Sequence, residues 1–376
     1  MKNQIKNKTL IFPWDINGYV KLNSNAKTKI LDFLINTHGF KSEISQTLNV
    51  PRYWIYNFIR NDKIDTITFK KILNLIKDNT LIKEIIQFND DNGSSSIPFK
   101  GKFPIRYDPL WHFIFCLSIG DGHIHKGSKK QFSWYQKPTG LKELVKLING
   151  MGFKYSPKIT TCKRGIVIPQ MIRKAGEFIT KLGNKNEMTE NIITISSKLG
   201  KDYEIALIAA FLMDEAGMGQ LKNNSEMTLH QEGNLNFLDD FGRLLNKFKI
   251  GWSRNKKGKK WNIRFNTGGI IKLAGLLESA KKYNISLLHR QEIFQKKAQI
   301  AIKTDYKSIL KLESRKVHNY LLNNYAGKVI TLNQIRKYYK SNYNISSRSL
   351  KLIEDMKRKS ELIIISMAKY KIGDER

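Results

Sequence analysis

The chain has 376 residues, enough for two or three domains of ordinary size. Hydrophobic residues make up 41% of it, which excludes a wholly disordered chain. Its 66 lysines and arginines against 32 acids give a net charge of +34, an excess typical of proteins that bind a polyanion. The longest apolar run, residues 205–213, is too short to span a bilayer, and the first residues lack the apolar stretch of a signal peptide. These features favour nucleic acid as the partner over a membrane or a small-molecule substrate.

The two cysteines, Cys116 and Cys162, form no CxxC motif and no cluster with histidines. Neither a disulfide framework nor a zinc site is therefore predicted. Two thiols fit a reducing compartment, so we expect a cytoplasmic protein, associated with the nucleoid if the source is prokaryotic.

Composition and periodicity divide the chain into four regions. Helical periodicity predicts an N-terminal helical domain, and a polar, turn-forming run followed by basic residues predicts a linker. A longer ordered core and a third helical region follow. The predicted boundaries are 1–88 for the N-terminal domain, 89–106 for the linker, 107–303 for the core and 304–376 for the C-terminal domain.

Residues 41–60 read as a short helix, a turn at Asn49–Val50 and a second helix that Pro51 opens. The pattern resembles the helix-turn-helix of repressor-type DNA-binding domains. An ordinary helical hairpin with a basic surface is the alternative. The helix-turn-helix interpretation would present three residues to the major groove: Arg52, Tyr53 and Tyr56.

The core contains an internal repeat, with copies over about 107–200 and 201–303. Each copy reads as helix, two strands, helix, two strands, helix. The copies match in the same order and at a nearly constant offset. The matching features are the acids Asp121 and Glu215, the strand ends at Gln136 and Gln231, the helices that follow them, and two basic hairpins. The sequence therefore predicts an α+β fold in which two αββαββα units are related by a pseudo-twofold axis.

Each copy opens with an apolar helix whose C-terminal end carries an acid, Asp121 in the first and Glu215 in the second. The helix dipole disfavours a carboxylate at this end, and a divalent cation between the two helices would remove the objection. The alternative is an ordinary helix end, with Gly122 in the left-handed conformation and Asp121 solvated. The recurrence at equivalent positions favours metal binding.

The segments Ile114–Gly122 and Ile208–Ala216 resemble the two LAGLIDADG helices of single-chain homing endonucleases. Two positions depart from the family pattern: Ile119 and Met213 replace an acid at the sixth position, and Ala216 replaces the final glycine. The resemblance covers about 200 residues.

The resemblance implies that the two helices pack through small residues, here Cys116 and Ala210. It also implies that one monomer cuts both DNA strands with Mg²⁺ or Mn²⁺. The residues matching the family's metal site are Asp121, Glu215 and the residues before them, Gly120 and Asp214. Basic residues around the attacking water would be Lys185 and Arg290.

In such a core the strands form a concave saddle on which alternate residues face a groove of the DNA. Basic residues recur at matching points of both copies, although any one of them could be an ordinary solvated side chain. The predicted DNA contacts are Lys126, Lys129, Lys130, Ser133, Gln136, Lys163, Arg164, Lys222, Thr228, Gln231, Arg254, Lys256, Lys257, Lys259, Lys260 and Arg264.

The C-terminal region reads as three helices and a β-hairpin over residues 361–372, which resembles a winged helix. Arg348 and Lys351 would lie at the start of its recognition helix. A helical appendage without a DNA contact is the alternative.

These features predict a site-specific, metal-dependent double-strand DNA endonuclease that acts as a monomer. A DNA-binding regulator that has lost cleavage and an RNA intron maturase are the alternatives. Presence of both Asp121 and Glu215 favours the enzyme.

Overall fold

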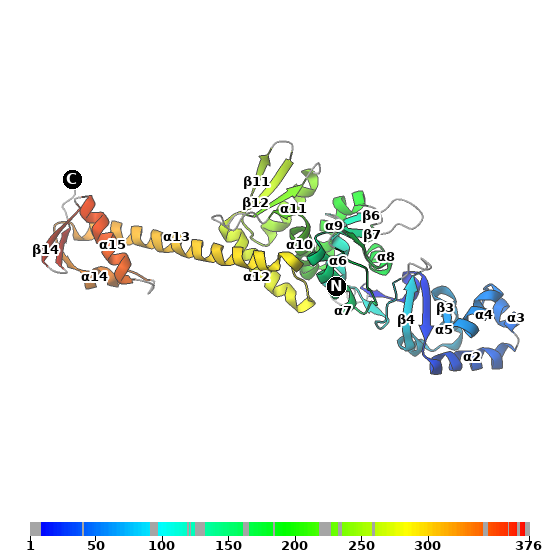
Figure 1. Cartoon of the computed structure of the whole chain (residues 1–376). Coiled ribbons are helices and arrows are strands. Elements are labelled where there is room, and N and C mark those ends of the chain that lie inside the picture. The colour runs from blue at the N-terminus through cyan, green and yellow to red at the C-terminus, as the bar shows by residue number, and fades with distance from the viewer. Residues whose placement is uncertain are drawn as a thin grey trace. The chain divides into compact units, whose positions relative to one another are not determined.

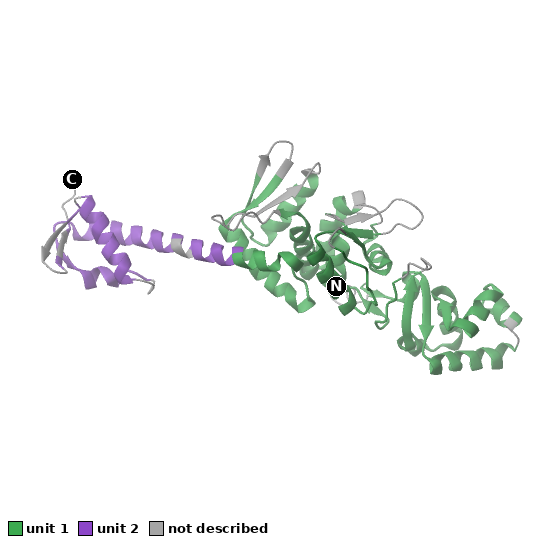
Figure 2. Ribbon diagram, viewed as in Figure 1, with its two compact units in different colours: residues 1–296 green, residues 297–376 purple. Residues whose placement is uncertain are grey.

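The computed structural model of the chain describes residues 9–39, 41–90, 97–118, 120, 122–124, 132–160, 165–182, 185–217, 227–231, 235–257, 260–340, 345–359, 361–366 and 369–372. In these ranges, helices combine with small antiparallel sheets, in agreement with the predicted α+β class (Figure 1). The chain forms two compact units, residues 1–296 and 297–376 (Figure 2). Among the described residues, no helix is both long enough and apolar enough to cross a membrane.

Unit 1 begins with a three-stranded antiparallel sheet and its helices, and the strand order is β3-β2-β4. A separate pair, β1 with β5, joins residues on either side of this region. The elements are β1 (Leu10–Ile11), η1 (Pro13–Asp15), β2 (Gly18–Leu22), α2 (Ser24–His38), α3 (Lys41–Thr47), α4 (Arg52–Asn61), β3 (Lys63–Asp65), α5 (Thr66–Ile76), η2 (Asn79–Glu84), β4 (Ile85–Asp90) and β5 (Ile105–Arg106).

The turn between α3 and α4 is stabilised by its backbone conformation and by two hydrogen bonds from side chains to its carbonyl groups. Asn49 adopts the left-handed conformation, with φ of 48°, and Pro51 precedes α4, where a missing N–H costs nothing. Ser45 Oγ donates to the Val50 carbonyl at 2.6 Å, and Lys71 Nζ donates to the Asn49 carbonyl at 2.9 Å. These bonds close the turn and connect it to α5.

The described part of the segment predicted as a linker, residues 97–106, packs into unit 1. The Phe99 and Phe103 side chains are buried, and the Phe99 ring lies 5.0 Å from the Phe153 ring and 6.1 Å from the Trp111 ring, between centroids. Phe99 also bridges the backbone of Phe88. Aromatic packing thus anchors a segment whose polar neighbours suggested a free linker.

The first half of the central region contains a three-stranded antiparallel sheet in the order β6-β7-β8. Asp108 caps its first helix, because the carboxylate accepts from the backbone of Leu110 and Trp111. The elements are α6 (Pro109–Cys116), β6 (Gly122–Ile124), β7 (Phe132–Tyr135), α7 (Pro138–Gly150), β8 (Gly165–Val167), α8 (Gln170–Thr180) and α9 (Lys185–Leu199).

The second half contains a four-stranded antiparallel sheet in the order β11-β12-β10-β9. Phe211, on the first helix of this half, packs against Phe237 and Phe241. These two residues lie on the helix that follows β10, so the two helices pack together. The elements are α10 (Lys201–Glu215), β9 (Ala216–Gly217), β10 (Met227–Gln231), α11 (Leu235–Lys247), β11 (Trp252–Lys257), β12 (Lys260–Phe265), α12 (Thr267–Ala280), η4 (Lys281–Tyr283) and η5 (Leu288–Arg290).

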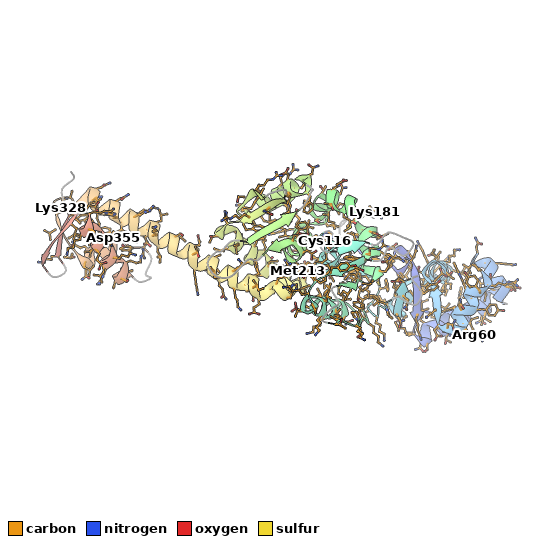
Figure 3. The ribbon with its side chains drawn as sticks, turned by 45° about the horizontal axis from the view of Figure 1, so that its top comes forward. Arg60, Cys116, Lys181, Met213, Lys328 and Asp355 are labelled. Carbon is orange, nitrogen blue, oxygen red and sulfur yellow. The ribbon has the colours of Figure 1, made fainter. Side chains whose placement is uncertain are left out.

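The helices α6 and α10 pack against each other at the centre of unit 1. Every residue of α6 is buried, and so is α10 from Glu204 to Asp214, as expected for helices that are apolar on all sides. Cys116 and Met213, one on each helix, are labelled in Figure 3, and both side chains are buried.

Unit 2 has its own apolar core, built from the C-terminal part of α13 (Gln291–Tyr325) and the elements after it. Its sheet is antiparallel, in the order β13-β15-β14. Val317, Leu321, Ile335, Ile353 and Met356 are central to this core. The remaining elements are β13 (Val329–Thr331), α14 (Leu332–Lys337), α15 (Ile345–Arg358), β14 (Leu362–Ser366) and β15 (Lys369–Ile372).

Candidate active site

The two apolar helices that open the two halves end differently. α10 continues to Glu215, a half-buried residue, as the sequence predicted. α6 ends at Cys116, before the predicted end, and the chain then turns. Within this turn Ser118 Oγ donates to the Phe115 carbonyl at 2.7 Å, which satisfies an acceptor at the helix end. Asp121 lies outside the described residues.

Gly120 lies against the last turn of α10. A Cβ atom on Gly120 would be 2.6 Å from Asp214 Cβ and 2.7 Å from Asp214 Oδ2, so only glycine fits here. Gly120, in the chain that follows α6, therefore meets the last turn of the helix that carries Glu215.

Asp214 connects the two halves of the central region. Its side chain is buried, and its Oδ1 accepts a hydrogen bond of 2.9 Å from Nε1 of Trp134 on β7. Burial raises the pKa of the neighbouring Cys116 thiol well above its usual value, and the Asp214 charge adds to this shift. Asp214 was predicted to contribute to the metal site, and the structure gives its carboxylate this structural bond to Trp134.

Arg290 lies at the end of α10. Its Nη1 donates to the Ala216 carbonyl at 2.6 Å, directly after Glu215. A cation at a helix C-terminus is stabilising, because it opposes the negative end of the helix dipole. Sequence reasoning required a metal ion to offset the dipole, and Arg290 contributes to that role from η5. Lys185, the predicted counterpart, begins α9, and its side chain lies outside the described residues.

The sheet of the first half presents one apolar and one mixed face. Phe132 and Trp134 are fully buried, so the alternation along β7 puts Ser133 and Tyr135 on the opposite face. Ser133, a predicted DNA contact, is buried with 5% of its surface exposed, whereas Tyr135 is 43% exposed. Tyr135 was not among the predicted contacts, although the alternation of β7 would have identified it. Gln136, another predicted contact, follows β7, and its side chain accepts from the backbone of Lys137 at 3.3 Å.

The register of the second sheet separates two arginines that sequence reasoning had grouped. Arg264 is exposed and stands opposite both Thr228 and Ser253, so these three positions form one cross-strand row. Arg254 is exposed as well, but it pairs in register with the buried Ile263. Its Nη1 lies 2.7 Å from the carboxylate of Asp239 on α11, on the helix-covered face of the sheet.

Several predicted contacts lie outside the described residues: Asp121, Lys126, Lys129, Lys130, Lys163, Arg164, Lys222 and Lys259. For others the backbone is described and the side chain is not: Thr228, Gln231, Lys256, Lys257 and Lys260.

The predicted contacts in the flanking regions differ in accessibility. On α4, Arg52, Tyr53 and Tyr56 are all exposed, with Tyr53 at 59%. In unit 2, Lys351 is exposed. The Arg348 side chain points inward instead: Nη2 lies 3.0 Å from Glu313 Oε2, and the guanidinium lies 4.4 Å from the centre of the Tyr339 ring.

A buried polar network holds α6 in place, and sequence reasoning missed it. His112 Nε2 lies 2.8 Å from Ser196 Oγ on α9, and His112 Nδ1 lies 3.1 Å from the Tyr107 hydroxyl. Burial lowers the pKa of His112 to about 3, so the imidazole is neutral. A neutral imidazole can accept from one hydroxyl and donate to the other.

The described residues contain no group of three or more histidines, cysteines or acids close enough to hold a metal ion. Mg²⁺ needs only one or two carboxylates, because it retains several waters. Glu215 supplies one such carboxylate at the end of α10. The sequence matches no model of a known protein family and no curated protein.

Proposed function

We propose that the chain is a site-specific double-strand DNA endonuclease of the LAGLIDADG homing type that requires Mg²⁺ or Mn²⁺. One observation carries the proposal: Gly120 meets the last turn of α10 at Asp214. In the sequence, Asp121 directly follows Gly120 and Glu215 directly follows Asp214. Each half thus has one acid next to this contact in the sequence, and cleavage of two strands by one chain needs an acid from each half.

The order of elements in the two halves supports this proposal. In the first half a buried helix is followed by β6, β7, a helix and β8, and β7 pairs with both other strands. In the second half α10 is followed by β9, β10, a helix, β11 and β12, and β10 pairs with β9 and β12. The same pairing around the central strand is expected of a duplicated core.

The chemistry needs a water in line with the scissile phosphate, a base and positive charge near the leaving oxygen. Mg²⁺ held by Asp121 and Glu215 would neutralise charge on the phosphate and on both reacting oxygens. Arg290 orients the end of α10 through the Ala216 carbonyl and adds a fixed positive charge beside Glu215. Trp134 fixes Asp214, and with it the last turn of α10.

Charge and accessibility support DNA as the substrate. The net charge of +34 favours a polyanionic partner, which would offset the self-repulsion of the folded chain. The exposed face of α4 carries Arg52, Tyr53 and Tyr56 behind a well-formed turn. Arg264 and Tyr135 are exposed on the sheets of the two halves.

The test is cleavage of a library of long DNA duplexes in the presence of Mg²⁺, followed by sequencing of the ends. The native chain is compared with Asp121→Asn, Glu215→Gln and the double variant. Glu278→Gln makes the same chemical change at an exposed acid on α12 and is the matched control. We expect discrete double-strand cuts with short 3′ overhangs from the native chain and the control, and no double-strand cuts from the double variant.

Three results would overturn the proposal. Tight, salt-sensitive binding to defined sites without cleavage by any version would identify a DNA-binding regulator. Cleavage that persists at the native rate in the double variant would place the chemistry elsewhere. Binding to a structured intron RNA in preference to duplex DNA would favour a maturase.

A further inference from the structure

One stretch of α13 in unit 2 is accessible to solvent all the way round. Residues 302–305 are exposed, and so are residues 308, 309, 311 and 312. Successive residues of an α-helix are separated by about 100°, so four consecutive exposed residues cover a full turn. This stretch therefore presents a surface that the folded core of unit 2 does not use.

A row of four basic residues runs along this stretch. Lys303, Lys307, Lys311 and Arg315 follow one another at intervals of four residues, which stacks them along one side of a helix. Lys303, Lys311 and Arg315 are exposed, and the side chain of Lys307 lies outside the described residues. The row is about 18 Å long at a rise of about 1.5 Å per residue.

The row lacks the acidic residues at ion-pair spacing that basic residues on an ordinary solvated helix often have. No aspartate or glutamate occurs three or four positions from any of its members in the sequence, so none can form an ion pair within the helix. Earlier in the same helix Lys296 does have such a partner, Glu292, at 2.5 Å. Like charges at four-residue spacing destabilise an isolated helix, and an external polyanion would reverse this effect.

The opposite side of the stretch argues against an anionic membrane as that polyanion. It carries the exposed apolar residues Ile302, Ile309 and Leu312, with the exposed Asp305 among them. A helix that lies in a membrane interface buries its apolar side, and here burial would press a carboxylate into an anionic surface.

We propose that the row from Lys303 to Arg315 binds the phosphate backbone of duplex DNA, as a contact additional to the DNA contacts predicted elsewhere in the chain. The inference rests on DNA being the substrate of the proposed endonuclease. The row matches the length of roughly five base pairs at about 3.4 Å each. Lysine and arginine along a helix provide such contacts without reading sequence.

The test is the salt dependence of binding to a duplex of random sequence. The row variant Lys303→Gln, Lys307→Gln, Lys311→Gln, Arg315→Gln is compared with a control that loses the same charge: Lys142→Gln, Lys198→Gln, Lys201→Gln, Lys272→Gln. The control residues lie on α7, α9, α10 and α12, outside the row. Each phosphate contact contributes about 0.9 to the slope of log K against log salt, so loss of four contacts in the row variant should lower the slope by about 3.6.

The control should change the slope by less than about 1, since its lysines lose only long-range attraction. Backbone amides of residues 302–312 should also exchange more slowly when DNA is added to the native chain, and not in the row variant. An unchanged slope in the row variant, or an equal loss in the control, overturns the inference. Loss of binding to phosphatidylserine vesicles with an unchanged DNA slope would identify a lipid surface instead.

This experiment is independent of the proposed cleavage. The row variant keeps Asp121, Glu215 and Arg290, so it should still cut duplex DNA at low salt, where the remaining contacts suffice. An unchanged slope together with cleavage by the native chain removes only the row contact. Tight salt-sensitive binding without cleavage removes only the nuclease.

Discussion

The two halves of the central region each contain a strand that pairs with two others, β7 in the first and β10 in the second, and they differ at the end of the helix that opens each half. α10 carries Glu215 as its last residue, and Arg290 donates to the carbonyl that follows. α6 stops at Cys116, and the chain reaches Gly120 through a turn. The two opening helices thus end differently, and the end of α10 has an arginine partner. If the halves act on different DNA strands, we expect the strands to be cut at unequal rates.

The largest effect should come from the close approach that joins the halves. Gly120→Ala places a Cβ 2.6 Å from Asp214 Cβ, so the turn and α10 must move apart. Overpacking of this kind costs about 1–3 kcal/mol, and we expect about 3 kcal/mol of unfolding free energy to be lost in denaturant titration.

Gly150→Ala is the matched control, because a Cβ on this residue of α7 would meet nothing within 4 Å. It should leave stability unchanged or raise it by about 0.5 kcal/mol, since alanine is a better helix former than glycine. Equal effects of the two substitutions would mean that Gly120 is not packed closely against α10.

A smaller loss should follow from Trp134→Phe, which removes the donor to the buried Asp214 carboxylate. A hydrogen bond to a buried charged group contributes about 2 kcal/mol. Trp252→Phe removes a similar bond to Asn246 at the surface and should cost under about 1 kcal/mol. If the cost of Trp134→Phe is no greater than that of Trp252→Phe, the two halves are not coupled through Asp214.

The pH dependence of stability reports on the packing of α6. The pKa of His112 is about 3 in the folded chain and about 6.5 when unfolded, so protons bind the unfolded state first. The stabilisation is complete above pH 6.5 and is lost as the pH falls, by up to about 1.4 kcal/mol per unit. Burial, together with the charges of Arg290 and Lys137, lowers the pKa of His289 to about 4, so it contributes in the same direction.

His112→Gln separates the two histidines. It should lower the unfolding free energy at pH 7, because the buried hydroxyls lose a partner. Below about pH 6.5 it should also reduce the slope of unfolding free energy against pH by the contribution of about one proton. Unfolding free energies measured between pH 7 and pH 5 would check this. A slope that the substitution leaves unchanged would show that His112 is solvated.

The smallest effect distinguishes the two faces of the second sheet. Arg264→Gln should lower the slope of log K against log salt for DNA binding by about 0.9, since Arg264 is exposed and lies opposite Thr228 and Ser253 in the sheet. Arg254→Gln should change it by much less, because its guanidinium pairs with Asp239 on the helix side. The reverse ranking would mean that DNA approaches the other face.

Local patterns in the sequence account for much of the fold. The continuous apolar run of α10 predicted a buried helix to Glu215, and Asn49 and Pro51 predicted the turn between α3 and α4. These features depend on residues that are close in sequence. Strand alternation would also have separated Arg254 from Arg264, had the register been known.

Interactions between residues distant in sequence could not be predicted in the same way. Arg348 looked like a DNA contact, but its partner Glu313 lies on another helix. The bond between Trp134 and Asp214 and the network around His112 join separate elements. The end of α6 at Cys116 depends on the local turn at Ser118 and on the close approach of Gly120 to Asp214.

The most direct test of the account is strand-resolved cleavage of a site cut by the native chain. Each strand is labelled separately, and Asp121→Asn and Glu215→Gln are assayed with Mg²⁺ at equal protein stability. We predict that each variant nicks the duplex and that the strand left intact differs between them. Two outcomes would contradict a division of the two strands between the two acids. Either single variant would cut neither strand, or both variants would leave the same strand intact.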